Sequence, residues 1–336
     1  MTLTNVSTEQ VIGIQKVSNL LEGRNVSQES LDYANICING NDNKLFLDPI
    51  LIYGDRQRNE LANRCWDIVR DYFYTLTREV AEGTLSIDSP TLEHLSEKNS
   101  FHLGHSEIVE GKNSRGNGCS PEMVYTIFER IGFDRLQEMV ERQLIVEPMD
   151  IFLYVKGFGE DRMSDLITNL LFRELAHYTE EIARHSAEAN DVNLQFIEKN
   201  AWYWDTEEHN WKQFTYNELL DTNNRPLTLV PKRFLTDYYR YNPQRFFRGV
   251  ILTHLQEEYL RNNPGQQKIS KDALEKQLKS ENSDFSQVDY ILECCLNNPT
   301  LSQEFRESNC HGALGNNYLG YLSDNKLTEV IELPYI

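Results

Sequence analysis

The sequence predicts an α/β or α+β core followed by a helical C-terminal region. Short apolar runs alternate with helical patterns between about residues 40 and 235. From Phe234 onward the patterns are helical and strand signals are missing. We therefore divide the chain into a lead-in at 1–44, a mixed core at 45–235 and a helical region at 236–336.

The composition is that of a globular protein with a large excess of acidic residues. Of the 336 residues 40% are hydrophobic, and the net charge is −19. This charge repels nucleic acid and anionic membranes, so a nucleic-acid substrate would require a local basic patch or a partner protein. No signal peptide, no apolar run of ~18 residues and no CxxC pair is present, which predicts a cytoplasmic protein without a membrane span or zinc knuckle.

The first half of the core begins with an interrupted apolar run. In KLFLDPILI we expect a strand end or edge strand, because Pro49 cannot donate to a central ladder. FHLG resembles a further short strand, and a helix is expected to begin at Ser120-Pro121, with Ser120 as N-cap. Residues 57–82 predict a helix whose apolar face carries Leu61, Cys65, Ile68, Val69, Tyr72 and Leu76.

The second half gives the strongest element signals. DIFLYVKG predicts a buried strand at 150–156, and the residues that follow predict a helix at 161–189. AWYWDTEEHNWKQF predicts a hairpin with three tryptophans near its turn, and PLTLV predicts another short strand. The core side of the 161–189 helix is expected to carry Leu166, Leu170, Leu171 and Leu175.

The other side of that helix carries an unusual polar stripe. A step of four residues runs through Asp161, Asp165, Asn169, Arg173 and His177. One interpretation is structural: Asp161 or Ser164 caps the helix and the rest is a solvated face. The other is a ligand site, because the glycine turn at 157–159 places the helix start near the end of the predicted strand.

Two further elements carry candidate chemistry, each with a structural alternative. Asp48 is either a strand-end turn residue that accepts backbone hydrogen bonds or a carboxylate ligand of Mg²⁺. Glu110-Gly111-Lys112 has the Glu-x-Lys spacing of metal-dependent nucleases, in which the lysine acts on the attacking water. The glycines around Lys112 and Arg115 could instead form an anion-binding loop before the helix at 121.

A resemblance adds context to these residues. The series LFLDP, LGHSEIVEGKNSRGNG, KGFGEDRMSD and LVPKRFL resembles an uncharacterised prokaryotic family associated with mobile elements and phage-defence gene clusters. The likeness covers most of the first 240 residues and is strongest in GFGEDRMSD. The sequence is only loosely similar to restriction-endonuclease-like nucleases. The usual compact arrangement of Asp and Glu-x-Lys is not clear here, because Asp48 lies 62 residues before Glu110.

Two functions are therefore expected. The first is a metal-dependent nuclease or nuclease-like effector of an anti-phage defence system, acting with a partner protein. The second is a non-enzymatic interaction or sensor subunit that binds a partner ATPase or a phage component, with residues 236–336 as its docking platform. A homo-oligomer is compatible with both. In the nuclease, Mg²⁺ would be held by Asp48, Asp161 and Asp165, catalysis would use Glu110 and Lys112, and substrate would be bound by Arg115, Arg162 and Arg173.

Overall fold

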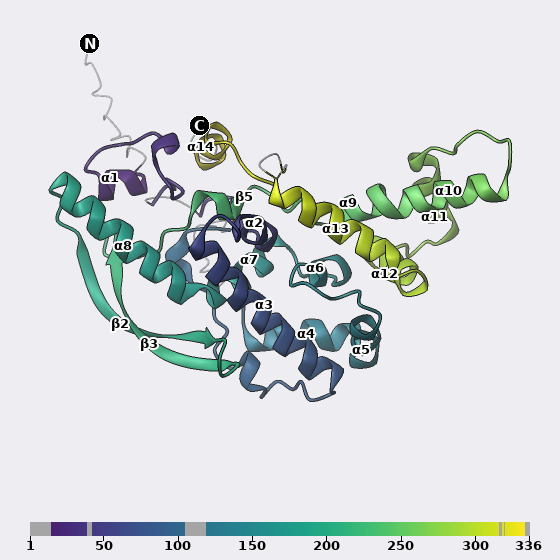
Figure 1. Ribbon diagram of the computed structural model, residues 1–336, viewed down its shortest axis with the longest axis horizontal. Helices are drawn as coiled ribbons and strands as arrows, with labels where there is room; N and C mark the ends of the chain where they lie inside the picture. The colour runs from purple at the N-terminus through teal and green to yellow at the C-terminus, as the bar shows by residue number, and fades with distance from the viewer. Residues whose placement is uncertain (1–14, 39–41, 105–118, 316–317, 319, 333–336) are drawn as a thin grey trace, which may run out of the picture.

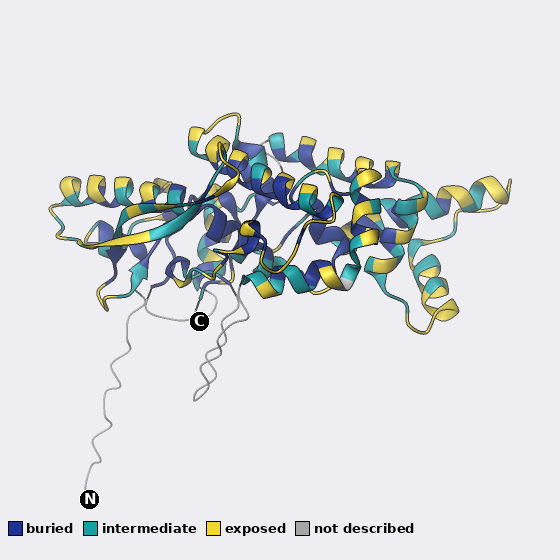
Figure 2. Ribbon diagram, turned by 90° about the horizontal axis from the view of Figure 1, so that it is seen from below, coloured by how far each residue is buried: buried dark blue, intermediate teal, exposed yellow. Residues whose placement is uncertain are grey.

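The computed structural model describes residues 15–38, 42–104, 119–315, 318 and 320–332. Within them, helices form most of the structure and are accompanied by two small antiparallel sheets, which confirms the predicted mixed core and the helical C-terminal region (Figure 1). Buried residues run through the centre of the elongated molecule, and exposed residues lie on the outer faces of its helices (Figure 2). None of the helices in these ranges is long and apolar enough to cross a membrane.

The first residues of the core form a strand end, as predicted. The two-residue strand β1 (Phe46–Leu47) pairs antiparallel with β5 (Leu235–Thr236), so the two ends of the predicted core meet. Pro49 then starts helix α2 (Pro49–Asp55), which follows the short N-terminal helix α1 (Val17–Leu21) in the chain. The FHLG segment at 101–104 is not a full strand: Phe101 ends a 3-10 turn (Asn99–Phe101), and Leu103 makes an isolated parallel β-bridge with Asn43.

Helix α3 (Glu60–Ala81) confirms the helix predicted at 57–82. Asn59 caps its first turn by accepting a hydrogen bond from the Ala62 backbone. The predicted face is buried except for Leu61, which is partly exposed. Ser120 caps α4 (Pro121–Ile131) as expected, and α5 (Phe133–Glu141) follows it.

The strand predicted at 150–156 is wrong, because residues Asp150–Tyr154 form the short helix α6. The Asp150 carboxylate accepts hydrogen bonds from the backbone N–H groups of Val146 and Glu147, which holds the preceding chain in a turn. All five residues of α6 are buried. A short apolar run without polar alternation is consistent with a fully buried helix as well as with a buried strand, and here it forms the helix.

The long helix predicted at 161–189 is present in two pieces, α7 (Glu160–Leu170) and α8 (Phe172–Asn190). They are separated at Leu171, whose backbone has φ −90° and ψ 4°. The four leucines predicted to face the core are all buried, which confirms the apolar side of both pieces.

The predicted hairpin is a long curved ribbon that lies along α8 and contacts the middle of α3 near its turn (Figure 1). It consists of β2 (Gln195–Asp205) and β3 (Asn210–Leu220), and β4 (Pro226–Leu227) pairs with the far end of β3. Trp204 lies opposite Trp211, and both are buried against Tyr72 of α3. The ribbon is therefore anchored to the helical core at its turn.

The last third of the chain is helical, as predicted. Its elements are α9 (Pro243–Phe246), a π-helical turn (Phe247–Ile251), α10 (Leu252–Asn262), α11 (Lys271–Glu281), α12 (Gln287–Asn297), α13 (Thr300–Leu314) and α14 (Asp324–Glu332). Helix α13 packs on α2 so closely that a Cβ atom on Gly54 would lie 2.3 Å from the Ala313 carbonyl oxygen. Arg306 of α13 also pairs with the buried Asp150 at 2.8 Å. Helices α10 and α11 project from one end of the molecule (Figure 1).

Candidate functional site

Asp161 and Asp165 lie in the first two turns of α7. The N-cap of this helix is Gly159, so neither Asp161 nor Ser164 has the capping role that the structural interpretation gave it. The Ser164 hydroxyl instead accepts a hydrogen bond from the Leu47 backbone at 3.0 Å, which fixes the helix against β1. The glycine turn continues directly into the helix, as expected.

The two aspartates belong to a group of carboxylates, Asp42, Glu97, Asp161 and Asp165, which we call the acidic cluster. Burial, and then the charges of Asp161, Glu97 and Asp42, raise the pKa of Asp165 to about 7. Three separate segments of the chain therefore bring negative charge to one place. Within the ranges that the structure describes, no three histidine, cysteine or carboxylate side chains are arranged to hold a metal ion.

The described residues on either side of segment 105–118, Gly104 and Cys119, lie at the acidic cluster. Gly104 has φ +111°, and a Cβ atom there would lie 2.6 Å from the Asp161 Oδ1 atom. At the other end, burial raises the pKa of the Cys119 thiol, and the charges of Asp165 and Glu97 raise it further. Glu110, Lys112 and Arg115, like His105, lie outside the described residues.

Asp48 has a different environment. It is the N-cap of α2 and accepts a hydrogen bond from the Ile50 backbone at 3.0 Å. Its Oδ2 atom is buried without a hydrogen-bond partner among the described residues. The pKa of Asp48 is raised to about 7, mainly by burial. The Ile50 hydrogen bond and Arg240 oppose this rise, and the charge of Glu160 adds to it.

Tyr239 connects the two environments, and sequence reasoning missed it. Its hydroxyl donates to the Leu47 carbonyl at 2.6 Å, and its backbone N–H donates to Glu160 Oε1 at 2.9 Å. Burial raises the pKa of this phenol, and Asp48, Glu160, Asp165 and Asp161 raise it further, in that order. Tyr239 therefore lies between Asp48 and the acidic cluster. No local pattern in the sequence indicated this role.

The rest of the polar stripe runs from the core to the surface, with Asn169 buried, Arg173 partly buried and His177 exposed. Asn169 is buried and donates to the Ser96 carbonyl at 2.8 Å. Arg173 lies 3.9 Å from the centre of the Tyr203 ring and pairs with Glu174 at 2.9 Å. The exposed His177 meets Phe214 edge-on, with ring centres 5.9 Å apart. Arg162, outside the stripe, donates to the Gly157 carbonyl at 2.6 Å.

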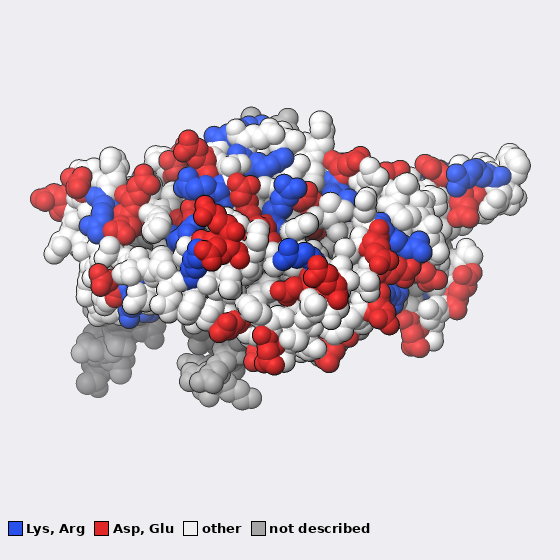
Figure 3. Space-filling view, turned by 60° about the horizontal axis from the view of Figure 1, so that its bottom comes forward, with Lys and Arg blue, Asp and Glu red and all other residues white. Residues whose placement is uncertain are grey.

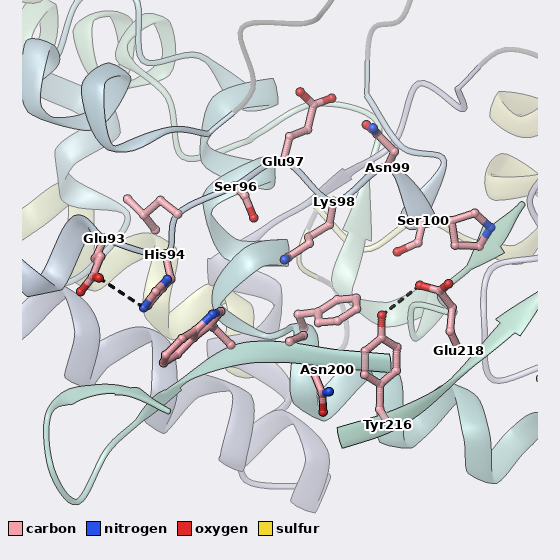
Figure 4. Close-up of a pocket in the computed structure, with 15 residues that line it drawn as sticks. Glu93, His94, Ser96, Glu97, Lys98, Asn99, Ser100, Asn200, Tyr216 and Glu218 are labelled. Atoms are coloured by element: carbon pink, nitrogen blue, oxygen red, sulfur yellow. Dashed lines mark hydrogen bonds and ion pairs between the residues drawn. The ribbon is translucent and has the colours of Figure 1, made fainter. Parts of the chain in front are cut away.

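A pocket of about 470 Å³ lies between segment 93–100 and the hairpin, next to Phe172 (Figure 4). His94 stacks on Trp202, with ring centres 3.7 Å apart. The Lys98 ammonium lies 4.9 Å from the centre of the Phe172 ring. Glu97 lines this pocket and also contributes to the acidic cluster, so the two features adjoin. The only sequence signal for the pocket was the aromatic content of the hairpin.

A family model described as a domain of unknown function, DUF8370, matches residues 24–242. The chain belongs to this family. No curated protein and no solved structure matches it. The DUF8370 region includes the acidic cluster, Asp48, Tyr239 and the pocket, whereas all of the helices from α9 onward lie beyond its end.

Proposed function

We propose that this protein is a metal-dependent nuclease, or a nuclease-like effector, of a bacterial anti-phage defence system, acting in the cytoplasm with a partner protein. The observation that carries the proposal is the pair Asp161 and Asp165 in an acidic cluster. Both described flanks of the segment with Glu110 and Lys112 lie at that cluster. Carboxylates gathered with a raised pKa are typical of sites that bind a hard cation or transfer a proton.

The proposed site divides its roles among a few residues. Asp161 and Asp165 would bind Mg²⁺, and Glu110 would supply a further carboxylate ligand. Lys112 would orient the attacking water or stabilise the transition state. The neighbours of Asp48 differ from those of the acidic cluster, and Tyr239 lies between the two. We therefore assign Asp48 a supporting role at the start of helix α2.

The net negative charge of the chain opposes the binding of a nucleic-acid substrate. Acidic side chains gather in several groups over the face in Figure 3, with basic side chains between them. Of the proposed substrate-binding arginines, Arg173 already pairs with Glu174 and stacks on Tyr203. Arg162 and Arg115 remain as proposals. A partner protein that grips the nucleic acid would relieve the repulsion expected from a charge of −19.

The second candidate function is a non-enzymatic interaction or sensor subunit. The observation that favours it is the projection of α10 and α11 from the body of the molecule (Figure 1). No residue of α11 is fully buried, so this helix is available to a partner along most of its surface. In this function the acidic cluster would be part of an interaction surface.

A cleavage assay separates the two functions. Purified protein is incubated with plasmid DNA and with RNA, in Mg²⁺ or Mn²⁺, with and without the products of neighbouring genes. A nuclease loses cleavage in the double variant Asp161→Asn, Asp165→Asn. It keeps cleavage in a control double variant, Asp134→Asn with Glu138→Gln, which removes an acidic pair one turn apart on α5. Cleavage that survives the first double variant would reject the proposed site.

A further inference from the structure

Lys98 is an unusual cation in an acidic protein. Its side chain points into the pocket between segment 93–100 and the hairpin (Figure 4). Burial lowers its pKa, and the ammonium lies over the Phe172 ring. Among the described residues it has no carboxylate partner. An ammonium that is partly removed from water without a counter-charge favours binding of an anion.

The acidic residues that line the pocket do not neutralise Lys98. Glu218 accepts a hydrogen bond from the Tyr216 hydroxyl at 2.9 Å, and Glu93 lies 3.8 Å from the His94 ring nitrogen. Glu97 extends away from Lys98 (Figure 4). The charged end of a ligand would therefore meet the ammonium first.

The rest of the lining suits a flat, polar ring. Trp202 with His94 stacked on it forms one wall, and Tyr216 packs edge-on against Phe172 with ring centres 5.1 Å apart. Asn200 and Ser100 add neutral donors and acceptors. A volume of about 470 Å³ is in the usual range for small-molecule sites. Aromatic walls beside a cation are the features that bind single nucleotides without reading their sequence.

We infer that this pocket binds a nucleoside phosphate, with the Lys98 ammonium on the phosphate and the base against the aromatic walls. The nucleotide is either free or one unit of a single strand. The inference that it belongs to the substrate strand rests on the proposed nuclease function. The position of the pocket supports this inference, because Lys98 in the pocket and Asp165 in the acidic cluster are both charged neighbours of Cys119.

Calorimetric titration in EDTA tests the pocket without any metal. The probes are adenosine monophosphate and a five-nucleotide single-stranded oligodeoxyadenylate. We expect the parent protein to bind, Lys98→Gln to bind roughly tenfold more weakly or worse, and Lys98→Arg to bind nearly as well. The matched control is Lys199→Gln, an exposed lysine on β2 outside the pocket lining, which should leave binding unchanged.

The outcomes separate this site from the nuclease. No binding of either probe, unchanged binding in Lys98→Gln, or an equal loss in Lys199→Gln would overturn the pocket. Stronger binding of the oligonucleotide supports a strand, and binding of the monophosphate alone supports a free nucleotide. Binding that persists in the double variant Asp161→Asn, Asp165→Asn confirms the pocket as a separate feature, even if no form of the protein cleaves nucleic acid.

Discussion

Asp165 lies one helical turn after Asp161 on α7, where burial and then the charge of Asp161 raise its pKa to about 7. The unfolded chain ionises this carboxyl near pH 4. Between about pH 4 and 7 the unfolded state therefore gives up the proton before the folded state does. The ionised carboxyl costs folding stability progressively over this range and fully above pH 7.

We expect Asp165→Asn to stabilise the protein at pH 8, by on the order of 1 to 4 kcal/mol, and to do so less at pH 5.5. The amide removes the charge that the folded state disfavours. Thermal or urea denaturation in EDTA at both pH values measures the difference. Asp134→Asn, an exposed change on α5, should have the same small effect at both. An equal effect of Asp165→Asn at the two pH values would contradict the raised pKa.

Asp48 combines a cap with a buried charge, and two substitutions separate these contributions. Asp48→Asn keeps the acceptor for the Ile50 N–H group and removes the charge. The parent loses stability as the pH rises from about 4 to 7, so the stability of Asp48→Asn relative to the parent should increase over this range. Asp48→Ala also removes the cap and should be less stable than Asp48→Asn by about 1 kcal/mol. Urea denaturation of both variants tests this order, which equal stabilities would reject.

Breaking the ion pair between Arg306 and Asp150 should cost much stability, because the Asp150 side chain is fully buried and the Arg306 side chain is only 12% exposed. The Asp150 side chain is fully buried and also accepts a hydrogen bond from Tyr241 at 2.5 Å. Arg306→Met should cost about 3–5 kcal/mol, since it leaves an unpaired buried carboxylate. Lys156→Met breaks an exposed pair with Asp289 and should cost less than about 1 kcal/mol. Similar losses for the two variants would count against this account.

The apolar side of α7 gives a simple packing test. Leu170 is 1% exposed, and Leu170→Ala should cost about 2–5 kcal/mol through the lost contacts and the cavity. Tyr74→Ala, at a residue 65% exposed on α3, should stay within about 0.5 kcal/mol of the parent. An unchanged melting temperature in Leu170→Ala would reject the packing of α7.

Long periodic segments were predictable from the sequence. The apolar face of α3 and the tryptophan-rich hairpin were both expected, because a repeated pattern over many residues favours one element type. The residues at 150–156 were wrongly predicted as a strand. Five apolar residues do not distinguish a buried strand from a buried helix. One of the hydrogen bonds to Asp150 at the start of α6 comes from Tyr241, 91 residues away, and no local pattern indicates it.

The candidate site was predictable only where its residues share one helix. Asp161 and Asp165 stood out because their spacing is helical. Glu97, Asp42 and Tyr239 did not, because tertiary folding alone brings them to α7. Lys98 gave no signal for the same reason: its environment is made by the hairpin and by Phe172, which are far from it in the chain.

The close approach of α2 to α13 affects how the family should be defined. The residues that identify the family end at 242, yet the contact at Gly54 and the partner of Asp150 come from residues near 310. A fragment trimmed to the shared region would expose apolar side chains of α2 to water and leave the Asp150 carboxylate without its cationic partner. In this chain the region that defines the family is thus shorter than the unit that folds, because α13, which lies beyond residue 242, supplies the cover for α2.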